Sequence, residues 1–146
     1  MNFSDFITHS GKRIKKQHFL NLIQVSKIDG KFSQQEMEML HREGRKFGLT
    51  DPEIDQLIKS ESTHSYDPPY SLRDKFEQLY NIAVMILADE EVTESEKKML
   101  KRFAIEAGFN DNVIEKLFNL LLDGIRKGDD EEKLFDEFRE KHLFSR

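Results

Sequence analysis

The chain has 146 residues, 37% of them hydrophobic and 35% charged, and a formal net charge of −5. A net acidic chain is not expected to wrap nucleic acid, because domains that do so usually carry a basic excess or stripe. The absence of cysteine excludes disulfides, thiolate metal sites and a cysteine nucleophile. The length suits one domain with a sizeable core, so we expect a single helical domain over residues 1–146.

The N-terminal region predicts neither export nor membrane insertion. Residues 1–16 have no apolar stretch ahead of their basic residues, so a secretory signal is not expected. The longest apolar run, Ile82 to Ala88, is far shorter than the roughly 20 residues that a transmembrane helix needs. We therefore predict a cytoplasmic protein with no direct membrane insertion. Phe3 and Phe6 favour a short N-terminal helix packed on the domain.

A first unit of three helices is predicted over residues 17–60. Its first helix carries apolar residues at helical spacing over residues 19–26. Its second helix begins with the capping box Ser33-x-x-Glu36, in which the hydroxyl and the carboxylate each accept a hydrogen bond from a free backbone N–H. We expect this helix to end at Gly48, because glycine adopts the left-handed conformation after a helix without a steric penalty.

The third helix and a linker complete the first unit. Asp51 is predicted as the N-cap, and Pro52 follows at a position where its missing N–H costs nothing. Residues 61–71 are polar and include Pro68 and Pro69, which predicts a stiffened linker and not a helix.

A second unit is predicted over residues 72–127. Its first helix, about residues 72–88, is apolar on nearly every side toward its end, which is typical of a central helix that neighbours surround. The residues expected to be almost inaccessible to solvent are Ile82, Ala83, Ile86 and Leu87.

The rest of the second unit follows the pattern of the first. Thr93-x-x-Glu96 is a second capping box, Gly108 is a second helix stop, and Asp111 is predicted as the N-cap of a longer third helix. A final helix is expected over about residues 129–143.

The two units align without a gap when the sequence is shifted by 60 residues. Chance would give roughly two or three identities over the aligned stretch at ordinary residue frequencies. Ten are found: Asn21/Asn81, Asp29/Asp89, Glu36/Glu96, Met39/Met99, Leu40/Leu100, Arg42/Arg102, Gly48/Gly108, Asp51/Asp111, Ile54/Ile114 and Leu57/Leu117. We therefore predict an all-α bundle of about six to eight helices with an internal two-fold-like repeat.

Four acidic residues form the candidate site: Asp29 and Glu36 in the first unit, and Asp89 and Glu96 in the second. Each pair spans a short turn between two helices. The aspartates follow a helix C-terminus, where the helix dipole disfavours an anion, so each needs a compensating partner. One interpretation is structural, with capping glutamates and aspartates that accept loop N–H groups. The other is a divalent cation, Ca²⁺ or Mg²⁺, held by these carboxylates.

Neither of two known metal-binding motifs fits both units of the chain. The turn after Asp29 places lysine and phenylalanine where a calcium-binding EF-hand loop needs ligands or turn residues, so that motif fails. Glu38 and His41 fit the Glu-x-x-His pattern of di-iron bundles, but the equivalent residues in the second unit are Lys98 and Lys101, which ligate nothing. No other catalytic motif is found, and we predict that the chain is not an enzyme.

The turn at residues 28–36 resembles the TerB family, which includes tellurite-resistance proteins and the N-terminal domain of DjlA-type co-chaperones. The shared pattern is an Asp-Gly step, a Ser-initiated helix and a glutamate, followed by a helix that ends in Gly-Leu or Gly-Phe, as at residues 46–49 and 107–109. Residues 88–96 fit the pattern with glutamate in place of the glycine. The resemblance covers about residues 15–125.

The resemblance implies an all-helical, non-enzymatic module linked to chemical stress, with a protein partner and with metal binding through the acidic positions Asp29, Glu36, Asp89 and Glu96. The His-Pro-Asp motif of a J-domain is absent, so a direct co-chaperone role is not expected. Two alternatives stay open: a metal-dependent enzyme of the carboxylate-bridged type, and a regulatory subunit of a larger complex.

Overall fold

The computed structural model describes residues 4–8, 11, 13–26, 32–88 and 92–143. Within them it contains seven α-helices, which confirms the predicted all-α bundle. The elements are β1 (Phe6–Ile7), β2 (Arg13–Ile14), α1 (Lys16–Ser26), α2 (Gln34–Arg45), α3 (Asp51–Glu61), α4 (Leu72–Leu87), α5 (Glu94–Glu106), α6 (Asp111–Lys127), α7 (Glu131–Phe138) and the π-helical turn η1 (Arg139–Leu143). The predicted C-terminal helix over residues 129–143 is thus α7 continued by η1.

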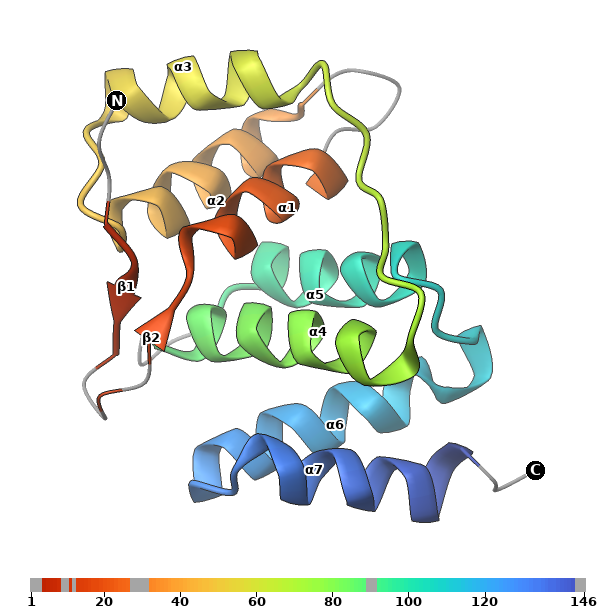
Figure 1. The fold of residues 1–146 in the computed structure, drawn as a ribbon. Helices are drawn as coiled ribbons and strands as arrows, with labels where there is room; N and C mark the ends of the chain where they lie inside the picture. The colour runs from red at the N-terminus through yellow and green to blue at the C-terminus, as the bar shows by residue number, and fades with distance from the viewer. Residues whose placement is uncertain (1–3, 9–10, 12, 27–31, 89–91, 144–146) are drawn as a thin grey trace.

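The helices pack in three tiers (Figure 1). Helices α1, α2 and α3 form the first tier, α4 and α5 the second, and α6 and α7 the third. The first two tiers meet where α1 contacts α4 and α5 and where α2 contacts α5, and α4 also packs against α6 and α7. The second helices of the two predicted units, α2 and α5, are therefore direct neighbours.

Local capping chemistry begins the second helix of each unit as predicted. At the other end, Gly108 directly follows the C-cap of α5 as predicted, whereas α2 ends at Arg45, three residues before Gly48. Ser33 caps α2 and Thr93 caps α5, and both capping boxes are complete. Gly48 and Gly108 follow these helices with φ of 80° and 98°, a left-handed conformation that glycine adopts without strain.

The third helices begin one residue earlier than predicted. Thr50, and not Asp51, is the N-cap of α3, and it forms a capping box with Glu53. Asn110, and not Asp111, is the N-cap of α6. Since the hydroxyl of Thr50 already accepts the Glu53 N–H, Asp51 stands in the first helical turn with its carboxylate free to reach other partners.

The N-terminal residues form a short antiparallel strand pair, so the predicted N-terminal helix and the expectation of no strands were wrong. Phe6 lies in β1 and packs its ring edge-on against Phe47, with ring centroids 5.9 Å apart. Asp5 accepts the backbone N–H of Lys16 and the Nε–H of Arg13, which ties the strand pair to the start of α1. Phe3 lies outside the described residues.

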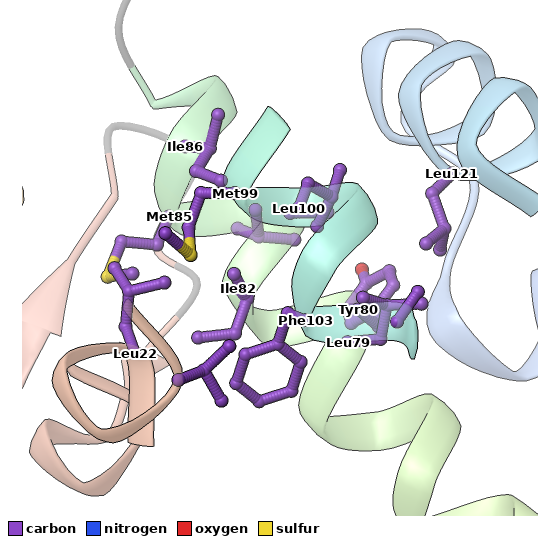
Figure 2. Packing of buried hydrophobic residues seen from close by; sticks show 14 of the residues in the cluster. Leu22, Leu79, Tyr80, Ile82, Met85, Ile86, Met99, Leu100, Phe103 and Leu121 are labelled. Atoms are coloured by element: carbon purple, nitrogen blue, oxygen red, sulfur yellow. The ribbon is translucent and has the colours of Figure 1, made fainter. Parts of the chain in front are cut away.

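The hydrophobic core runs through all three tiers, and α4 is its centre. Ile82, Ala83 and Ile86 are fully buried, as predicted, whereas Leu87 is only half-buried, so the prediction for Leu87 was wrong. Side chains of the neighbouring helices α1 and α5 pack against α4, among them Leu22 and Phe103 (Figure 2).

The linker between α3 and α4 is not helical after Ser62, in agreement with the prediction. It contacts the second tier through Tyr66. The ring of Tyr66 packs on Phe103 with centroids 5.0 Å apart, and its hydroxyl donates to Gln78 at 2.6 Å. Burial, reinforced by the nearby charge of Asp67, raises the pKa of Tyr66 to about 12. The polar linker is thus anchored by one aromatic side chain.

Replacing Ile82 by alanine should lower the free energy of unfolding by about 2–5 kcal/mol, because the deletion leaves a cavity in a fully packed site. Leu87→Ala serves as the matched control on the same helix and should cost clearly less, since Leu87 is only half-buried. Chemical denaturation of both variants at pH 7 measures the difference. Equal losses would show that α4 is not the centre of the core.

Candidate functional site

The structure describes two of the four predicted site residues. Asp29 and Asp89 lie outside the described residues. Glu36 and Glu96 lie in the first turns of α2 and α5, each as the third helical residue of a capping box. The described residues contain no group of three or more histidine, aspartate or glutamate side chains that could hold a metal ion.

One oxygen of each glutamate is engaged by the helix cap. The backbone N–H of Ser33 donates to Oε1 of Glu36 at 2.8 Å, and that of Thr93 donates to Oε1 of Glu96 at 2.9 Å. In return, the two hydroxyls accept the N–H of the glutamates at 3.1 Å. The structural interpretation of Glu36 and Glu96 as capping residues is therefore confirmed.

The second oxygen of each glutamate faces an arginine of the opposite helix. Nε of Arg42 in α2 lies 3.7 Å from Oε2 of Glu96, and Nη1 of Arg102 in α5 lies 3.6 Å from Oε2 of Glu36. Glu36 matches Glu96 and Arg42 matches Arg102 when the sequence is shifted by 60 residues, so the contact is reciprocal. A cation bound to the same oxygens would be repelled by the adjacent guanidinium. The prediction of a bound Ca²⁺ or Mg²⁺ ion therefore relies on the carboxylates of Asp29 and Asp89 as ligands.

Two hollows lie along the junction of α2 and α5. The larger has a volume of about 320 Å³ and the smaller about 150 Å³, and Gln35, Met39 and Ser95 line both. The larger is also lined by Ser33, Glu36, Lys98, Met99 and Arg102, and the smaller by Glu38, Arg42 and Thr93.

The two hollows are equivalent under the repeat. Gln35, Glu38, Met39 and Arg42 line the smaller hollow, and their counterparts 60 residues later line the larger one: Ser95, Lys98, Met99 and Arg102. The main chemical difference is at the exposed rim, where Glu38 of one hollow corresponds to Lys98 of the other. The junction thus forms a groove with Met39 in both hollows and Met99 in the larger one, and with a lysine at one rim where the other has a glutamate.

A buried carboxyl group that the sequence analysis missed lies at the same junction. Glu43 of α2 is 0% exposed, and its Oε1 accepts a hydrogen bond from Nζ of Lys46 at 2.7 Å. Nζ of Lys46 also donates to the backbone carbonyl of Met85 in α4 at 2.7 Å. The repeat offered a signal, because the position equivalent to Glu43 is Phe103, a core residue, so an acid there had to be buried.

Glu43 contacts the equally buried Glu96. Burial raises the pKa of Glu43 to about 8; Lys46 lowers it and Glu96 raises it further. Oε2 of each glutamate is buried without a hydrogen-bond donor. A proton on Glu43 supplies that donor, because a protonated carboxyl can donate to a neighbouring carboxylate.

The residues of the di-iron alternative do not come together. His41 points to α3, where its ring nitrogens lie 2.9 Å from Asp51 and 2.7 Å from Asp55. Glu38 instead accepts a hydrogen bond from Gln34 on its own helix. The Glu-x-x-His spacing therefore does not build a metal pair here.

No family model, no curated protein and no solved structure matches this chain. The TerB resemblance therefore stays a prediction from the motif residues. Within the described part of the chain, none of the helices has the length and apolar character needed to cross a membrane.

Glu43→Gln should make the protein more stable at alkaline pH. Because the folded pKa of Glu43 is raised from 4.5 to about 8, the stability that its proton contributes is complete below pH 4.5 and is lost as the pH rises to about 8. The loss amounts to at most about 1.4 kcal/mol per pH unit in this window. A glutamine amide keeps a donor toward Glu96 at every pH.

The measurement is the free energy of unfolding of wild type and Glu43→Gln from pH 5 to pH 9, with the exposed Glu38→Gln as control. The advantage of Glu43→Gln over wild type should grow up to about pH 8 and then level off. A difference that does not change with pH would contradict a buried, titrating Glu43.

The double change Glu36→Gln with Glu96→Gln tests the cation interpretation. Glutamine still accepts the cap N–H, so capping should persist, whereas a hard cation prefers charged carboxylate oxygens. We expect any melting shift caused by millimolar calcium, magnesium or manganese, relative to chelator, to be the same in wild type and double variant. A shift seen only in the wild type would identify these glutamates as ligands.

Proposed function

We propose that this chain is a cytoplasmic, non-catalytic, TerB-like helical module that binds a protein partner in the groove between α2 and α5. The observation that carries the proposal is the pair of equivalent hollows along this junction, with Met39 and Met99 beneath and polar side chains on the rim. An apolar centre within a polar rim is the usual arrangement of a protein interface.

The floor of the groove suits apolar side chains of varied shape. Met39 and Met99 are unbranched and polarizable, and methionine adapts its rotamers to irregular partners. The volume of the larger hollow, about 320 Å³, is small for a cofactor but suits one or two inserted side chains. A helix or extended segment of a partner is therefore the occupant that the groove fits best.

The charges at the rim give the occupant a direction. Each hollow is lined by one arginine, Arg42 in the smaller and Arg102 in the larger, so the difference between them is Glu38 against Lys98. A segment with an acidic residue near Lys98 and a basic residue near Glu38 is complementary. Such rim charges mainly influence association rate and specificity.

The walls of the groove are pre-formed. Both helices are fixed at their N-termini by complete capping boxes, and the ion pairs Arg42–Glu96 and Arg102–Glu36 join them. A site whose shape is set before binding loses less conformational entropy when a partner docks.

A photo-crosslinking residue at Ser95, which lines both hollows, tests the proposal in cells that express the protein. We expect a discrete crosslinked species that is absent when the same residue is placed at Gln56, an exposed position on α3. Adding Lys98→Glu should reduce the Ser95 product several-fold, because it reverses a rim charge. The same species from Gln56, or a product indifferent to Lys98→Glu, would contradict binding in this groove.

A further inference from the structure

His41 joins α2 to α3 through both of its ring nitrogens. Nδ1 lies 2.9 Å from Oδ1 of Asp51, and Nε2 lies 2.7 Å from Oδ1 of Asp55. The imidazole is mostly buried between the helices, while both aspartates are exposed on their outer sides. Arg45 shares Oδ1 of Asp51, with its Nε 3.0 Å away.

This geometry fits the protonated form of the ring. A neutral imidazole has one N–H and one acceptor nitrogen, so it would turn a lone pair toward one of the two carboxylates. Partial burial lowers the pKa of His41, but the hydrogen bonds and negative charges of Asp51 and Asp55 outweigh that effect and raise the pKa above its ordinary value. The charged groups that face the ring are these two aspartates and, through Asp51, Arg45.

The second unit has the same connection with a different cation. Lys101 and Glu115 occupy the positions 60 residues after His41 and Asp55, and Nζ of Lys101 lies 2.7 Å from Oε1 of Glu115. The ammonium group of Lys101 also lies 5.0 Å from the centre of the Phe118 ring. In both units, then, a cation on the second helix binds an acid on the third, but an imidazole loses its charge near neutral pH and a lysine does not.

We propose that His41 is a proton-operated clasp between α2 and α3, which holds the two helices together when the ring is protonated and weakens their contact when the proton leaves, while the equivalent contact between α5 and α6 stays closed. The stabilisation is complete below the unfolded pKa of 6.5 and is lost as the pH rises through the raised folded pKa. Arg45 still pairs with Asp51 after the ring loses its proton, and the neutral ring can donate to only one of the two aspartates.

The first test is a titration of the full-length wild-type protein, with the imidazole nitrogens of His41 followed by NMR. We expect both nitrogens to be protonated at pH 6, and the titration midpoint to lie above 6.5 and to fall in Asp55→Asn. A midpoint at or below 6.5, or one that Asp55→Asn leaves unchanged, would overturn the proposal.

The second test exchanges the cations of the two units. The melting temperature of His41→Lys should rise relative to wild type between pH 6 and pH 8.5, because the clasp then keeps its charge. The melting temperature of Lys101→His should fall relative to wild type over the same pH range, because this variant places a titrating ring in the second unit. Glu43 is present in all three proteins, so its own titration cancels in the differences. Melting differences that do not change with pH would overturn the proposal.

Discussion

The contact of α2 with α5 is the constraint on which the rest of the structure depends. Two glutamates that cap these helices each face an arginine from the other helix, so the same two glutamates cap their own helices and join the helices to each other. A buried carboxylate is tolerable only with such partners, since an unpaired buried charge costs several kcal/mol. The need to satisfy Glu96, which is fully buried, therefore fixes how the first tier sits on the second.

The two units share this contact but differ in the chemistry around it. Glu43 stands opposite Glu96 in the first unit, whereas the equivalent position in the second unit is the apolar Phe103. Likewise, the cation that joins the second helix to the third is His41 in one unit and Lys101 in the other. Both differences place the titrating group in α2.

The sequence predicted the features that depend on neighbouring residues and missed those that depend on packing. Capping boxes and glycine stops are local, and Ser33 and Thr93 were placed correctly. Thr50 and Asp51 are both good caps side by side, but only Thr50 has a glutamate three residues later, so the prediction of Asp51 overlooked the local capping box Thr50-x-x-Glu53. The match of Arg42 with Arg102 is visible in the sequence. Their ion-pair partners, Glu96 and Glu36, each lie on the other helix, so these contacts could be found only from the packing of α2 against α5.

The anchored linker has an optical consequence. The chain has no tryptophan and three tyrosines, so its near-ultraviolet signal at wavelengths longer than the phenylalanine bands comes from tyrosine. Tyr80 is 6% exposed in the core and Tyr70 is 101% exposed on the linker, while Tyr66 lies between these extremes, stacked on α5. A change in the near-ultraviolet tyrosine signal without a change in the far-ultraviolet helical signal would therefore report separation of Tyr66 from Phe103. Tyr66 thus serves as a natural spectroscopic probe of the linker.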